Sequence, residues 1–130
     1  MQRVAFVLFL ILIPIAMAHG NDDPLQTANI VYRLSEEMIL HGSEGHAHEI
    51  ITFGEKMIEE LDHLPNLLHQ RKIGNQKKVL KQIKEIRKRA EEAVFFSKKR
   101  SLQPALKSAR LASFHAKKLR DDLRSSGKKN

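Results

Sequence analysis

The sequence contains no cysteine. Its absence excludes a disulfide framework, a thiolate zinc site, an iron–sulfur cluster held by cysteine and a cysteine nucleophile. Any metal ligands must therefore come from histidine, carboxylate or methionine side chains. Tryptophan is also absent and tyrosine occurs once, which leaves little aromatic surface for stacking bases and argues against nucleic acid as a partner. Gly-rich phosphate loops and His-Glu-x-x-His motifs are not evident, so we expect a protein that is not an enzyme.

Acidic residues are missing from the first stretch of the chain, residues 1–18. This stretch has a positive charge at Arg3, an apolar run from Val4 to Ile13, and an ending in Ala16-Met17-Ala18, the small-x-small pattern of a signal peptidase site. The apolar run is shorter than the roughly 20 residues that span a bilayer. We therefore expect a signal peptide cleaved after Ala18, export to the periplasm and no transmembrane anchor in the mature chain.

The formal net charge of +8 hides two halves of opposite sign. Residues 19–70 hold ten acidic residues, two basic residues and six of the seven histidines, for a net charge of −8. Residues 71–130 hold twenty basic and five acidic residues, for a net charge of +15. Metal chemistry therefore belongs to the first half. The basic half is expected to meet an anionic envelope surface, an anionic polymer, an acidic protein or the acidic half of its own fold.

Apolar residues recur at helical spacing through most of the chain, without sustained alternation, which predicts four helices. Ser43 is a candidate cap for the second helix, and Pro65 is expected to end it. Residues 65–75 then form the longest connection, and residues 125–130 form a flexible basic tail. We expect the helices from about Pro24 to Gly42, from Ser43 or Gly45 to Pro65, from about Gln76 to Ser97 or Arg100, and from Leu102 onward.

Each predicted helix has one apolar stripe to bury, which favours an all-α fold. We predict an antiparallel up-down four-helix bundle made of two helical hairpins, over residues 19–124. Met38 and Met57 lie on the apolar rows and are expected in the core rather than as Cu(I) ligands. A faint repeat relates the two hairpins at an offset of 55 residues, where Ser35-Glu36-Glu37-Met38 matches Ala90-Glu91-Glu92-Ala93. An accidental match of helical periods explains this similarity equally well.

One dense cluster of ligand-type residues lies between the first two predicted helices, in His41-Gly42-Ser43-Glu44-Gly45-His46-Ala47-His48-Glu49. The two glycines allow a sharp reversal, which brings His41 and His46 from separate helices to one end of the bundle. Each of these histidines has a carboxylate nearby on its own helix, as a further ligand or as a partner that fixes its tautomer. The predicted metal site comprises Glu37, His41, His46, His48 and Glu49.

Imidazole and carboxylate ligands without thiolate favour Cu(II) in the Irving–Williams order, followed by Ni(II) or Zn(II) according to supply. The alternative is a capped helical turn whose histidines are merely polar. In that case the chain is a structural or interaction protein, and its basic second hairpin docks on an anionic partner or envelope surface.

The pattern His-Gly-x-Glu-Gly-His between two amphipathic helices, after an export signal and without cysteine, resembles the small metal-binding protein family. The resemblance implies a His-rich periplasmic four-helix bundle that binds copper and other divalent ions in metal buffering or tolerance. His41 and His46 match the family's turn histidines, and His115 matches a histidine position in the second hairpin. The resemblance implies one principal site, because other histidine positions of the family carry different residues here. These residues are Phe53, Glu60, Phe96, Ser101 and Ser108.

Two further motifs are weaker candidates. Cleavage after Ala18 would place His19 at the N-terminus, where its amino group and imidazole chelate Cu(II) together, but no second histidine is identifiable nearby. The segment Glu60-Leu61-Asp62-His63 has the Glu-x-x-His spacing of di-iron carboxylate bundles, which need that motif on two helices. We expect a flexible polar N-terminus and a solvated helix end instead.

Overall fold

The structure is a computed structural model that describes residues 23–128. The predicted signal peptide, its cleavage site and His19 lie outside the described residues. No strand occurs in the described part of the chain, so the predicted all-α class is confirmed. The helices are α1 (Pro24–Ser43), α2 (Ala47–Arg71), α3 (Gln76–Lys98) and α4 (Leu102–Gly127).

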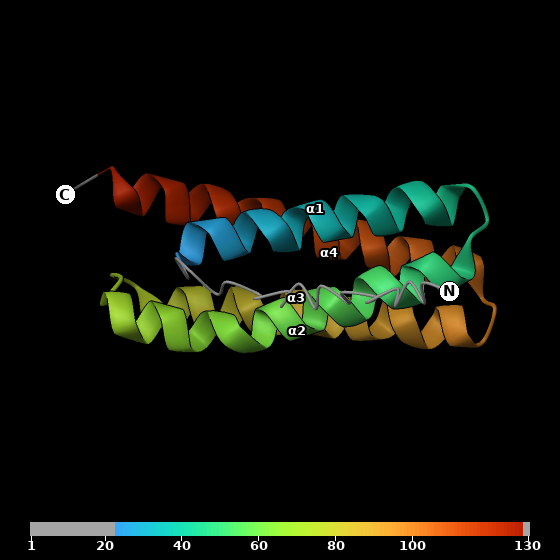
Figure 1. Cartoon of the computed structure of the whole chain (residues 1–130), viewed down its shortest axis with the longest axis horizontal. Coiled ribbons are helices and arrows are strands. Elements are labelled where there is room, and N and C mark those ends of the chain that lie inside the picture. Colours follow the sequence, from blue (N-terminus) through green and yellow to red (C-terminus); the bar gives the residue numbers. More distant parts are fainter. Residues whose placement is uncertain (1–22, 129–130) are drawn as a thin grey trace, which may run out of the picture.

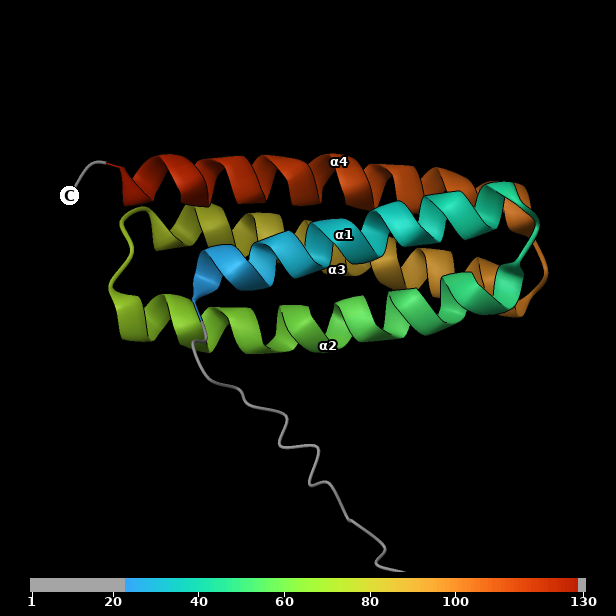
Figure 2. The same cartoon turned by 45° about the horizontal axis from the view of Figure 1, so that its top comes forward.

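Each helix runs antiparallel to the next along the chain, and the four form a bundle (Figure 1). α1 packs against α2 and α4, and α3 packs against the same two helices. α2 and α4 therefore lie on one diagonal of the bundle. The α1–α2 and α3–α4 turns lie together at one end, while the α2–α3 turn and the end of α4 lie at the other (Figure 2). The predicted up-down bundle of two hairpins is confirmed.

The apolar rows of all four helices meet in one core. Met38 and Met57 are fully buried there, as predicted. Burying one large apolar side chain contributes roughly 1.5–3 kcal/mol, so these rows fix which face of each helix turns inward. α4 supplies mostly small side chains to the core, which lets its neighbours approach closely. Its fully buried alanines are Ala105, Ala109, Ala112 and Ala116.

Pro65 does not end α2, contrary to the prediction. The helix continues through it to Arg71, so the α2–α3 connection is only residues 72–75 and not the expected 65–75. A proline inside a helix costs roughly 3 kcal/mol. The extra turns bury Leu67 and Leu68, which are 7% and 1% exposed. Burial of two leucines contributes a similar or larger amount, so packing against the bundle outweighs the local cost of the proline.

The first turn also differs from the prediction. α2 begins at Ala47, and Ser43 does not cap it: Ser43 is the last residue of α1 and its Oγ donates to the carbonyl of Ile39. Gly42 does not stop α1 but lies within it, buried against α2 and α4. A Cβ at Gly42 would lie 2.6 Å from Leu106 Cδ2. This glycine is therefore explained by a close approach between helices rather than by a helix end.

The far end of α4 extends to Gly127, whereas the tail was expected to begin at residue 125. Ser125 and Ser126 each donate through Oγ to a carbonyl one turn earlier, those of Asp121 and Asp122. These bonds follow the helical spacing of the last turn. No helix within residues 23–128 is both long and apolar enough to cross a membrane.

Candidate metal centre

The α1–α2 turn is a Schellman motif, a C-terminal helix cap closed by two backbone hydrogen bonds. The N–H of His46 donates to the carbonyl of His41 at 2.9 Å, and the N–H of Gly45 donates to the carbonyl of Gly42 at 3.1 Å. Gly45 has φ +87°, the left-handed conformation that this motif requires. In a Schellman motif the side chains at the two ends of the longer bond commonly touch. Here these side chains are the imidazoles of His41 and His46.

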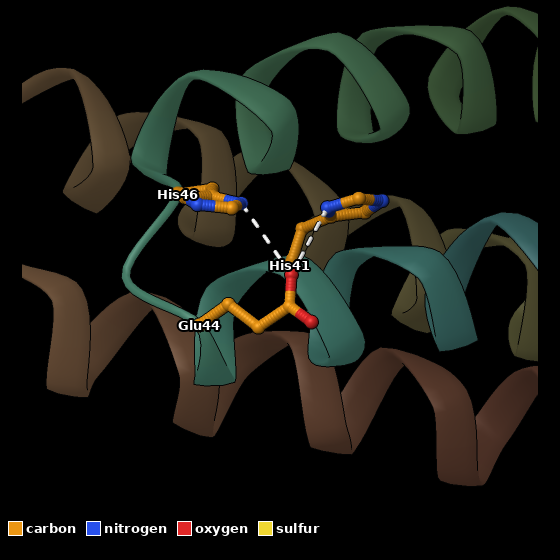
Figure 3. Close-up of side chains that lie close together, drawn as sticks. All are labelled: His41, Glu44 and His46. Carbon is orange, nitrogen blue, oxygen red and sulfur yellow. Dashed lines mark ion pairs between the residues drawn. The ribbon is translucent and has the colours of Figure 1, made fainter.

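Glu44 lies between the two imidazoles, as Figure 3 shows. Its Oε2 is 3.7 Å from Nδ1 of His41 and 3.5 Å from Nδ1 of His46. The two ring centroids are 5.9 Å apart. One ligand atom from each of the three residues lies within 4.8 Å of the other two. The turn thus gathers two nitrogens and one oxygen around a common point.

The imidazole of His41 is held on two sides by other side chains. Its ring stacks on Phe53 of α2, with centroids 5.4 Å apart and an interplanar angle of 20°. On the other side Oε2 of Glu37 lies 3.6 Å from Nε2. A carboxylate beside Nε2 favours the tautomer that keeps its proton on that nitrogen and leaves the Nδ1 lone pair for a metal.

Nδ1 of His41 is buried and makes no hydrogen bond. The nearest carboxylate oxygen, Oε2 of Glu44, is at 3.7 Å and beyond hydrogen-bond distance. A buried imidazole nitrogen without a partner costs free energy unless another ligand satisfies it. This nitrogen faces Glu44 and His46, so an ion at the common point would supply the missing partner.

His46 is also free to act as a ligand. It occupies the N-cap position of α2, yet its side chain makes no capping hydrogen bond. Its side chain is 51% exposed, as is that of Glu44, whereas that of His41 is 28% exposed. The cluster therefore opens to solvent on the side of His46 and Glu44, which gives an ion an entry path and room for a water ligand.

The structure brings together only part of the predicted site. His41 and His46 meet as expected, and Glu37 contacts His41. His48 and Glu49 are not among the three residues that converge. Glu44 takes the place expected for them, because it is the cap residue of the Schellman turn and lies between the two histidines. The sequence signal for this role was the glycine directly after Glu44, which marks the left-handed position of such a cap.

The remaining positions from the family resemblance lie elsewhere. Phe53 supports His41, as described, and Glu60 lines a shallow groove between α1 and α2. His115 lies on α4 with Nε2 at 4.0 Å from Glu85. Ser108 contacts Glu92 at 3.3 Å. Within residues 23–128 no other group of His, Asp and Glu residues converges as the turn cluster does.

The α3–α4 turn repeats the geometry of the first turn at the predicted offset of 55 residues. The N–H of Ser101 donates to the carbonyl of Phe96 at 2.8 Å, and that of Arg100 donates to Ser97 at 3.0 Å. Arg100 has φ +56°, so it fills the place that Gly45 fills in the first turn. Phe96 and Ser101 replace the two histidines, and this turn therefore offers no imidazole ligands.

Comparison of the chain with protein-family models, with curated proteins and with solved structures gives no match in any of the three. The resemblance to the small metal-binding protein family therefore stays a prediction, and the functional argument depends on the cluster itself.

Proposed function

We propose that this protein binds a divalent metal ion, with Cu(II) preferred, at His41, Glu44 and His46, and that it buffers that ion in the periplasm. The observation that carries the proposal is the buried Nδ1 of His41, which has no hydrogen-bond partner and faces two further ligand atoms. The resemblance of the turn motif to the small metal-binding protein family supports the same assignment.

The distances between the ligand atoms suit a metal ion. Nitrogen and oxygen ligands bind Zn(II) at roughly 2.0–2.2 Å, so neighbouring ligands in a tetrahedral site lie about 3.4 Å apart. The carboxylate oxygen of Glu44 is 3.7 Å from one histidine nitrogen and 3.5 Å from the other. The three ligand atoms all lie within 4.8 Å of one another, so the two imidazoles would move closer together to complete the first three bonds, and solvent beside the exposed side chains supplies a fourth ligand.

The ligand set favours Cu(II) over other ions. Two imidazole nitrogens and one carboxylate oxygen contain no soft sulfur ligand, and such sites follow the Irving–Williams order with Cu(II) at its maximum. Ni(II) and Zn(II) would bind the same ligands less tightly. An ion held by three protein ligands beside open solvent exchanges more readily than one in a closed four-ligand site, and ready exchange is what a buffering role requires.

Titration of Cu(II) into the purified full chain, followed by calorimetry and by the visible absorption of the copper, tests the site. The His41→Ala, His46→Ala double variant should lose at least a hundredfold in affinity for the tightest ion, and Glu44→Gln about tenfold, because ligand contacts are removed. The titration uses the uncleaved chain, in which the nitrogen of His19 lies in a peptide bond and does not compete as an amino chelate.

A matched control removes two histidines of the same hairpin that lie outside the cluster. The His48→Ala, His69→Ala double variant should retain the affinity of the unaltered protein. Equal loss in the two double variants, or no loss in either, would reject His41, Glu44 and His46 as the site. Loss in the control alone would place the ion at His48, as the sequence first suggested.

A further inference from the structure

The acidic residues of the second hairpin are all engaged in ion pairs with basic side chains. Glu85 and Glu92 pair with Arg89, and Glu91 pairs with Arg87. Asp121 pairs with Arg120, and Asp122 with Lys78. Among the described residues, only two ion pairs join a Lys or Arg of one hairpin to an acidic residue of the other: Arg87 with Asp62 and Lys98 with Glu55. The acidic half of the chain therefore neutralises little of the basic half.

A set of exposed basic side chains forms no ion pair among the described residues; of these, Lys118 interacts electrostatically with Asp122, which is already paired with Lys78. We call this set the cationic face; it is formed by the outer surfaces of α3 and α4. Four of its lysines line one groove between α3 and α4, together with His115 and two glutamates that are paired with arginines. Its members are Lys81, Lys84, Lys88, Lys107, Arg110, Lys117 and Lys118. Charge of one sign at this density attracts an anionic partner.

Phe114 projects from the cationic face. It is 65% exposed, the highest value among the exposed large apolar side chains of the described residues. Arg110, Lys117 and Lys118 lie one helical turn before or after it, so they surround it on the same side of α4. One bulky apolar side chain encircled by cations suits a partner that is anionic at its surface and apolar just beneath.

We propose that the cationic face docks on an anionic phospholipid bilayer, with Phe114 inserted at the boundary between headgroups and acyl chains. Basic side chains gain from the negative potential of such a surface, and an aromatic side chain gains from burial below the headgroups. A nucleic acid fits less well, because successive bases need several aromatic platforms, and the described part of the basic hairpin exposes only two phenylalanines, Phe95 and Phe114. An acidic protein needs only the charges and leaves Phe114 unexplained.

Because the chain has no cysteine, one introduced cysteine carries a polarity-sensitive fluorophore to a chosen face. Gln103→Cys places the label on the outer side of α4, and Gln70→Cys places it on α2, diagonally across the bundle. The labelled chain without residues 1–18, whose apolar run would bind lipid by itself, is mixed with vesicles of equimolar phosphatidylcholine and phosphatidylglycerol. We expect a blue shift of the fluorescence at position 103 and none at position 70, and no shift with phosphatidylcholine alone. Equal shifts at the two positions would overturn the proposal.

Vesicle affinity of variants gives a second readout. The Arg110→Gln, Lys117→Gln variant should bind the anionic vesicles roughly tenfold or more weakly, since each basic side chain near the surface contributes to attraction. The control Arg33→Gln, Lys56→Gln removes the same charge from the first hairpin and should bind like the unaltered chain. Phe114→Ser should weaken binding several-fold, whereas Leu40→Ser, which removes an exposed leucine of α1, should not.

Binding should also fall as salt rises, because salt screens contacts between exposed charges. Affinity that is indifferent to salt, or controls that weaken binding as much as the test variants, would overturn the proposal. So would retention on soluble polyanions without any response to vesicles. The metal site lies on the other hairpin, so failure of this proposal leaves the Cu(II) assignment intact, and the reverse also holds.

Discussion

The backbone N–H of His46 donates to the carbonyl of His41 at 2.9 Å, and this one bond sets the two imidazoles of the proposed metal site next to each other. Both residues belong to a single helix cap, so the metal centre depends on the local conformation of five or six residues more than on distant packing. The cap in turn depends on the left-handed backbone of Gly45.

Gly45→Ala should weaken Cu(II) binding and destabilise the fold. A left-handed conformation costs a residue with a Cβ roughly 1–2 kcal/mol, so the free energy of unfolding should fall by about that amount in urea denaturation. Gly74→Ala is the matched control, because Gly74 does not have a positive φ and a Cβ there meets nothing within 4 Å. A Gly45→Ala variant with unaltered stability and affinity would contradict the role of the cap.

Arg100→Gly should stabilise the protein without changing metal affinity. Arg100 adopts φ +56°, a left-handed conformation that is unstrained for glycine and strained for arginine. Relief of this strain should raise the free energy of unfolding by about 1 kcal/mol in urea denaturation. Lys99→Gly serves as the control: Lys99 has φ −86°, so glycine there should bring no such gain.

Glu37→Gln should lower the affinity for Cu(II) about tenfold while the fold stays unchanged, because partners of a ligating histidine tune its affinity by such factors. Glu37 lies 3.6 Å from Nε2 of His41 and favours a proton there. Nitrogen NMR of the metal-free protein should show His41 protonated at Nε2, and the variant should show a mixture of tautomers. Glu49→Gln, outside the cluster, should leave tautomer and affinity unaltered.

Cu(II) should raise the thermal stability of the protein. A ligand that binds only the folded state at a hundredfold excess over its Kd adds about 2.7 kcal/mol. The gain should disappear in the His41→Ala, His46→Ala variant. It should also fade as pH falls, because protons compete with the metal and only unprotonated imidazole binds it. Thermal unfolding followed by circular dichroism at several pH values measures both effects; a metal-dependent gain that persists in the double variant would refute the assignment.

The stability of the α3–α4 pair should depend on Asp122 in acid. The side-chain hydrogen bond from Gln82, assisted by Lys78, lowers the pKa of Asp122 below its ordinary value of 3.8. Because the folded state has the lower pKa, this stabilisation is complete above pH 3.8 and is lost as pH falls through the folded-state pKa. Asp122→Asn should therefore flatten this acidic part of the stability profile in urea denaturation. Its Cu(II) affinity near neutral pH should be unaffected.

The helical periodicity of apolar residues was enough to predict the number of helices, the antiparallel bundle and the core positions of Met38 and Met57. It misplaced the end of α2, because the cost of Pro65 is local while the burial of Leu67 and Leu68 depends on the neighbouring helices. Only the assembled bundle makes that burial available, so no local rule shows which effect is larger.

The candidate site likewise has features that the sequence predicts and features that depend on packing. The sequence alone determined that one glycine-containing turn carries the clustered histidines, because helix caps follow local rules that glycine and helical spacing reveal. The tertiary structure decided what surrounds the turn: His48 and Glu49 stay outside the cluster, and Phe53 of α2 stacks on His41. The direction of a side chain depends on the rotation of its helix against its neighbours, and packing of the whole bundle fixes that rotation.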